Sequence, residues 1–163
     1  MKRLLIPAAV AAAGVLAFAV VNASAGHSNL QKPRDRGHHF GRTIHVVEHA
    51  TSDAVTNGNA NVDEAGNILT FANDVYDASD TTKVGTDQGS CVRIVVGKSW
   101  ECMWTTFLPH GQITVEGPFY DAGDSVLAIT GGTGIYRNAR GEMELKYHNS
   151  AGTEFDFVFH LIG

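Results

Sequence analysis

Apolar and polar side chains alternate with a period of two along most of the chain after residue 42, and this pattern predicts β-strands. The C-terminal segment is the clearest example, because Phe155, Phe157, Phe159 and Leu161 place four apolar side chains on one face. Short segments rich in glycine, proline and aspartate separate the strands and suit hairpin turns. The expected strands are residues 43–49, 68–74, 91–96, 100–108, 113–119, 125–130, 141–147 and 155–162.

The number of strands and the lack of helical patterning define the fold class. No stretch of ten or more residues in this region carries an amphipathic helical stripe. About eight antiparallel strands in so short a chain predict an all-β domain, either a barrel or a sandwich. A closed up-and-down barrel removes edge strands and leaves an interior that can hold one small ligand. We expect this domain to span residues 42–163.

The first residues have the pattern of a secretory signal peptide. Two basic residues precede an apolar run from Leu4 to Val21, and Ala23 and Ala25 form an A-x-A cleavage site. We expect residues 1–25 to be removed by cleavage after Ala25 and residues 26–41 to form a flexible polar leader. The alternative is an uncleaved anchor, since about 18 apolar residues could just span a bilayer. Cleavage predicts a secreted protein with no stable membrane insertion.

Charge and missing motifs exclude several classes of function. The chain has 12 Lys and Arg against 17 Asp and Glu, a net charge of -5, so a phosphate-neutralising patch for nucleic acid is not expected. The sequence contains no G-x-S-x-G elbow and no H-E-x-x-H motif. Its eight histidines show no carboxylate-backed ligand triad. We therefore expect no metal and no other cofactor.

The two cysteines flank a turn signal. Cys91 and Cys102 lie on either side of Gly97-Lys98, where a tight hairpin would bring them nearly opposite each other. A cross-strand disulfide is the expected state in an oxidising compartment. The alternative is a free Cys91 thiol in a pocket.

Two polar residues fall on the apolar faces of predicted strands. Glu48 shares a face with Ile44 and Val46, and Asn73 shares one with Leu69 and Phe71. A polar group on an apolar face needs either a partner or a function, so Glu48 and Asn73 are candidate catalytic residues. The alternatives are a rim salt bridge or an outward position for Glu48, and a turn role for Asn73.

Aromatic residues would line the rest of the interior. Trp100 and Trp104 share a strand face with Cys102, and Phe71 lies on the face of Asn73. This lining suits a hydrophobic small molecule with one or two oxygens, for which Phe71, Trp100 and Trp104 are candidate binding residues. The alternative for the tryptophans is ordinary core packing.

Two segments carry a family resemblance. The segment 113–145 contains GPF, then AITGGTGIY and ARG, and resembles the allene oxide cyclase and dirigent barrel family. The sequence FANDVYDASDTTKVGTDQGSC is similar to the cyclase pattern F-T-N-x-x-Y followed by a G-x-C step. The resemblance covers roughly residues 43–163 and implies an eight-stranded calycin-like barrel that is commonly a homotrimer.

The resemblance also assigns site residues. The matches to the cyclase pocket are Glu48, Phe71, Asn73 and Cys91. Phe119 stands where the cyclases place a tyrosine, and Ala50 where they place an asparagine. Arg140 matches the arginine of the dirigent F-R-x-A-R-G step, while Gly134 occupies a position where lignan-forming dirigent proteins often have an aspartate. Phe119 and Arg140 therefore join the candidate ligand-binding residues. The glycines of GGTG are expected to form a turn.

Two classes of function follow. In the first, the barrel steers the cyclisation or stereoselective coupling of a hydrophobic small molecule without a cofactor, and a dirigent-type role would need a separate oxidase. In the second, it is a non-catalytic, lipocalin-like binding protein. An inward Glu48 with a raised pKa would favour the first class.

Overall fold

The computed structural model describes residues 40–56 and 62–162. The signal peptide predicted for residues 1–25 and nearly all of the predicted leader lie outside these residues. The first described strand begins at Phe40, inside the predicted leader of residues 26–41. Among the residues described, no helix is long and apolar enough to cross a membrane.

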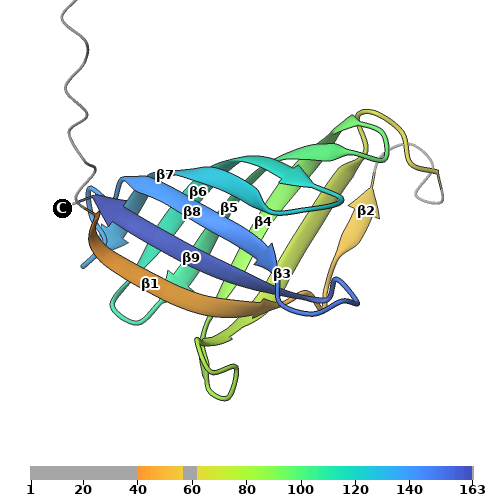
Figure 1. Ribbon diagram of the computed structural model, residues 1–163. Helices are drawn as coiled ribbons and strands as arrows, with labels where there is room; N and C mark the ends of the chain where they lie inside the picture. Colours follow the sequence, from red (N-terminus) through yellow and green to blue (C-terminus); the bar gives the residue numbers. More distant parts are fainter. Residues whose placement is uncertain (1–39, 57–61, 163) are drawn as a thin grey trace, which may run out of the picture. The chain divides into compact units, whose positions relative to one another are not determined.

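The described chain forms a closed eight-stranded antiparallel barrel with one short additional strand (Figure 1). The strands are β1 (Phe40–His49), β2 (Ala54–Thr56), β3 (Ile68–Asp77), β4 (Lys83–Val95), β5 (Ser99–Leu108), β6 (Gly111–Tyr120), β7 (Ser125–Gly134), β8 (Gly141–Tyr147) and β9 (Glu154–Ile162). From β3 to β9 each strand pairs with the next one in the chain, while β1 pairs with both β9 and β3. The barrel prediction is confirmed, and β2 is a short strand that pairs with β3.

Most strands extend beyond their predicted ends, and the extensions of β4 and β7 contain glycines that hide the alternating pattern. β4 begins at Lys83 rather than at residue 91, and Gly85 and Gly89 occupy inward positions in its first half. A Cβ atom on Gly89 would lie 2.3 Å from the Cβ of Trp104, its partner on β5. Only glycine therefore leaves room for the tryptophan side chain over β4 at this position. An apolar alternation could not reveal strand positions that must lack a side chain.

The GGTG segment belongs to β7, and its prediction as a turn is wrong for Gly131 and Gly132. Both continue the ladder with β6, and only Gly134 has a left-handed backbone, with φ of 60°, where the chain leaves the strand. A Cβ atom on Gly132 would lie 2.4 Å from the carbonyl oxygen of Tyr136. Close approach of the following turn therefore explains this glycine.

Aromatic and aliphatic side chains fill the barrel. The four apolar residues predicted to share one face of β9 are all buried, which confirms that pattern. Phe157 packs against Trp104 with ring centroids 5.4 Å apart, and against Phe159 at 6.4 Å. Each such side chain contributes about 1.5 to 3 kcal/mol by leaving water. The interior of the barrel is therefore the hydrophobic core.

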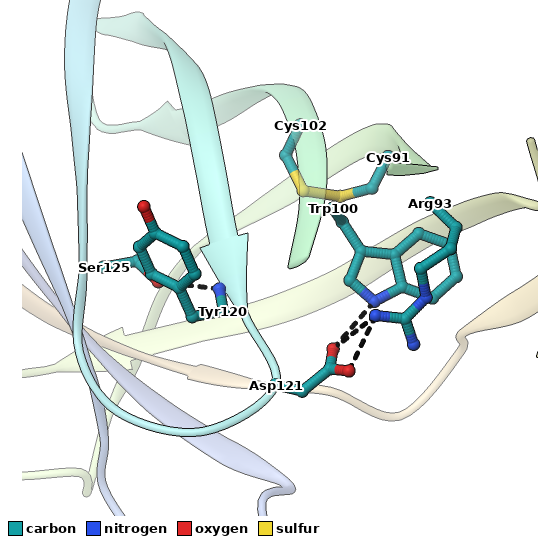
Figure 2. Close-up of a disulfide and its surroundings, with 7 residues drawn as sticks. All are labelled: Cys91, Arg93, Trp100, Cys102, Tyr120, Asp121 and Ser125. Atoms are coloured by element: carbon teal, nitrogen blue, oxygen red, sulfur yellow. Dashed lines mark hydrogen bonds and ion pairs between the residues drawn. A yellow bond between two sulfur atoms is a disulfide. The ribbon is translucent and has the colours of Figure 1, made fainter. Parts of the chain in front are cut away.

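A disulfide and an ionic cluster fix one end of the β4–β5 hairpin (Figure 2). Cys91 and Cys102 are directly paired across the two strands and form the disulfide, so the alternative of a free thiol is wrong. The Arg93 guanidinium lies 4.0 Å from the Trp100 ring centroid and donates to both carboxylate oxygens of Asp121 at 2.7 Å. Trp100 Nε1 also donates to Asp121, which ties the hairpin to the β6–β7 turn.

We expect loss of the disulfide to destabilise the barrel. Replacing both cysteines by serine should lower the free energy of unfolding by about 2 to 3 kcal/mol, because the cross-link restricts the unfolded chain over a short loop. Urea denaturation of the double variant and of the oxidised wild type measures this. An unchanged midpoint and slope would contradict it.

Neighbouring glycines of β7 provide a matched pair of variants. G132A should destabilise the barrel by about 1 to 3 kcal/mol, because the new methyl overlaps backbone oxygens of Tyr136 and Gln112. G131A places a methyl 3.2 Å from the Thr114 hydroxyl alone, so its cost should be clearly smaller. Thermal denaturation of both variants checks the difference, and equal costs would show that close approach does not explain Gly132.

Candidate functional site

A cavity of about 70 Å³ lies inside the barrel and opens to solvent. Its wall is mainly apolar and includes five aromatic residues: Phe71, Trp104, Phe119, Phe155 and Phe157. The edge of Phe71 meets Trp104 with ring centroids 6.0 Å apart. The disulfide also faces the cavity, while its polar side is formed by three residues from β1, β3 and the chain before β2: Glu48, Asn73 and Asp53.

Asn73 organises this polar side. Its Nδ2 donates to Glu48 Oε1 at 2.9 Å and to Asp53 Oδ1 at 3.1 Å. Its Oδ1 accepts from the backbone N–H groups of Thr51 and Ser52, each at 3.0 Å. The amide therefore holds the loop after β1 and also faces the cavity. Asn73 itself lies inside β3, so its alternative role as a turn residue is wrong. Because both Nδ2 hydrogens are used, its orientation is fixed.

Glu48 points into the barrel, so the alternatives of an outward position and a rim salt bridge are wrong. Only 5% of the residue is exposed. Burial raises the pKa of Glu48 to about 7; the hydrogen bond from Asn73 opposes this rise, and the negative charge of Asp53 adds to it. A carboxyl group with this pKa can both accept and donate a proton near neutrality.

A second buried carboxyl group, which the sequence analysis missed, lies behind Glu48. Asp87 on β4 is 1% exposed and accepts from the backbone N–H of Asn73 at 3.3 Å. Burial, followed by the charge of Glu48, raises the pKa of Asp87 to about 9. Asp87 lies in the polar, glycine-containing half of β4, whose composition gave no sign of a buried strand.

The remaining predicted site residues divide into two groups. Phe71, Trp104 and Phe119 line the cavity, as predicted. Trp100 is buried in the ionic cluster beside the disulfide and is not part of the cavity lining. Arg140 is exposed, and its carbonyl oxygen accepts from the N–H of Ile162, at the end of β9 opposite the one that pairs with Glu48.

One group outside the barrel brings potential metal ligands together. His49, Asp80 and Glu154 each place a ligand atom within 4.8 Å of the others. His49 Nε2 and Asp80 Oδ1 are joined by a direct hydrogen bond of 2.7 Å, and the His49 ring stacks on Tyr76. The hydrogen bond and the stacking account for the positions of His49 and Asp80, and we assign a structural role to this pair.

Comparison with solved structures shows the same barrel in proteins of different activities. A pyocyanin demethylase superposes with a TM-score of 0.60 and 24% identity over 71% of this chain and 98% of its own. The pterocarpan synthase dirigent protein PsPTS1 gives a TM-score of 0.59 and 22% identity over 75% of this chain and 96% of its own. AbnU, an exo-specific intermolecular Diels-Alderase, superposes with a TM-score of 0.61 and 18% identity over 75% of this chain and 98% of its own.

At these identities the structural likeness establishes the barrel fold alone. The sequence itself supplies a finer assignment. Residues 45–161 match the model of the family described as allene oxide cyclase, a span that contains the whole cavity and both buried carboxyl groups. The chain belongs to the allene oxide cyclase family.

Proposed function

We propose that the barrel binds a hydrophobic small molecule bearing one or two oxygens and steers its cyclisation or stereoselective coupling without a cofactor. The observation that carries this proposal is the Glu48–Asn73 pair, hydrogen-bonded at 2.9 Å in the wall of a largely apolar cavity. A buried carboxyl group beside a pocket is a costly feature for a domain that needs only a stable core.

The chemistry would arise from restriction and proton transfer. Rigid aromatic walls limit a flexible substrate to few conformers, which removes part of the entropic barrier to ring closure or coupling. Glu48, with its pKa near 7, exchanges a proton with the substrate or stabilises charge that develops on it. Asn73 holds the Glu48 carboxyl group in one orientation through its amide.

The comparisons support a reaction of this kind. Their names include a cyclase family, a dirigent protein and a Diels-Alderase, all carried by one barrel architecture. A dirigent-type role would require a separate oxidase as partner. Export after cleavage at Ala25 and assembly as a homotrimer complete the proposal, on the basis of the N-terminal sequence and the family resemblance.

A neutral hydroxyarene tests binding in the cavity. We expect 1-naphthol to quench the fluorescence of Trp104, which lines the cavity, in W100F, where Trp104 is the remaining tryptophan. W104F retains only Trp100, outside the lining, and should show much weaker quenching. Fluorescence titration of the two matched variants measures the effect. Equal quenching in both would place the ligand elsewhere.

Product stereochemistry separates catalysis from simple binding. An allene oxide generated in situ, or a pair of phenoxyl radicals from a one-electron oxidant, gives racemic product in solution. We expect the protein to produce an enantiomeric excess with one of these probes, measured by chiral chromatography. E48Q should slow the stereoselective pathway by about 10²-fold, because it removes the proton acceptor.

Glu116→Gln is the matched control, since Glu116 is an exposed residue on β6. It should leave both rate and stereoselectivity unchanged. Racemic products from both probes, together with intact 1-naphthol binding, would reject the catalytic proposal in favour of the lipocalin-like binding function.

A further inference from the structure

Three carboxyl groups from separate segments converge on Asn73. Glu48 comes from β1, Asp53 from the chain just before β2, and Asp87 from β4. The side-chain amide of Asn73 donates to the first two, at 2.9 and 3.1 Å, and its backbone N–H donates to Asp87 at 3.3 Å. A hydrogen bond between the Glu48 and Asp87 side chains contributes to the pKa shift of each carboxyl group.

A hydrogen bond between two carboxyl groups requires a proton, because carboxylates only accept hydrogen bonds. Two adjacent buried carboxylates would also repel each other at short range in a medium of low polarity. The nearby charged groups are Asp53, which adds to this repulsion, and His49, which opposes it. The pair must therefore retain one proton over a wide range of pH.

The surroundings place this proton on Asp87. Glu48 receives the Asn73 amide hydrogen and borders the cavity, whereas Asp87 lies behind it and is 1% exposed. Asp87 Oδ2 accepts no hydrogen bond from the described residues, as expected for the oxygen that carries the proton. Glu48 lines the cavity and Asp87 does not, and this difference in position gives the two carboxyl groups different roles.

We propose that Asp87 is a positioning residue that keeps a proton and donates it in a hydrogen bond to Glu48, so that Glu48 faces the cavity as a carboxylate and selects substrates with an acidic hydroxyl group, such as phenols and enols. This inference rests on the proposed function, because it concerns the same cavity. It adds a residue behind the cavity wall and a substrate class.

The proton transfers balance without a further reagent. The Glu48 carboxylate accepts the hydroxyl proton of the bound substrate, which leaves a substrate oxyanion and a neutral Glu48. After the substrate electrons rearrange and a new bond forms, Glu48 returns the same proton to the product. Asp87 keeps its own proton throughout, and its O–H stabilises the Glu48 carboxylate before and after the cycle.

Carboxyl ¹³C NMR of the ligand-free protein tests this assignment directly. In the wild type we expect one buried carboxyl group to titrate near pH 7 and another near pH 9. D87N should lose the titration near pH 9, while Glu48 still titrates near pH 7, because the new side-chain amide can donate a hydrogen bond to Glu48 in place of the Asp87 O–H. D87A should raise the pKa of Glu48 by one unit or more, because no donor remains.

Two outcomes of this experiment would overturn the inference. One is a wild-type protein in which every carboxyl group titrates below about pH 6. The other is a D87A variant that folds and in which Glu48 titrates as in the wild type. Since D87N retains the shape of Asp87, it remains informative if D87A fails to fold.

Ligand selectivity tests the substrate class at pH 7.5. The wild type should bind 1-naphthol at least fivefold more tightly than naphthalene, which lacks the hydroxyl group. D87N should keep this preference and D87A should lose it, because Glu48 becomes neutral and no longer acts as a strong acceptor. If D87A still prefers 1-naphthol over naphthalene, the proposed role of Asp87 is wrong. If neither arene binds, the result counts against the proposed function, and the NMR titration alone decides the role of Asp87.

The buried pair also predicts how stability varies with pH. Both pKa values are raised above those of an unfolded chain, so between about pH 4 and 9 the folded protein holds protons that the unfolded protein has released. The contribution of the pair to the free energy of unfolding should therefore fall as pH rises through this range. In D87N the free energy of unfolding should fall less steeply in the alkaline part of this range, as measured by urea denaturation at several pH values. If it falls equally in the wild type and in D87N, Asp87 does not hold a proton.

Discussion

Closure of the barrel by β1 is the constraint on which the remaining structure depends. β1 pairs with β9 on one side and β3 on the other, so the sheet has no free edge between them. In the same ladders Glu48 lies opposite Val75 of β3 and Phe155 of β9. Closure therefore brings Glu48 beside Asn73 and places both at the wall of one interior.

The site combines two environments that oppose each other energetically. Aromatic side chains exclude water from the cavity, and this exclusion disfavours the ionised forms of Glu48 and Asp87. Asn73 offsets part of the cost, because three of its N–H hydrogens point at three different carboxyl groups. The carboxyl groups are thus held in place with proton affinities close to the range in which proton transfer is useful.

The β4–β5 hairpin makes part of the cavity wall rigid. The disulfide links β4 to β5 in the cavity wall, and Arg93 with Asp121 ties the same hairpin to the β6–β7 turn (Figure 2). Gly89 lets Trp104 lie across β4, where it contacts both Phe71 and Phe157. A wall fixed in this way suits the selection of one substrate conformer, since the side chains that shape it have little freedom to move.

The sequence by itself determined most of the strand pattern, the places of Cys91 and Cys102 on either side of a turn, and the strand faces that Glu48 and Asn73 share with apolar residues. These features are local, because alternation with a period of two assigns each side chain to a face before any tertiary contact forms. The extent of β4 and β7 was not predictable in this way, because their glycines are explained by backbone and side chains from neighbouring segments. The same limit applies to Trp100 and Arg140, whose places along the barrel depend on register and tilt rather than on face.

Only the tertiary structure decided that Asp87 meets Glu48. The two residues are far apart in the chain and lie on strands that are not paired with each other. Glu48 stands out on an apolar strand face, whereas Asp87 looks like an ordinary acidic residue in a polar segment. Their contact arises across the inside of the closed barrel, with β3 and Asn73 between them. The pKa of a buried carboxyl group depends on the distance to such neighbours and on the water they exclude, and neither quantity exists until the barrel has closed.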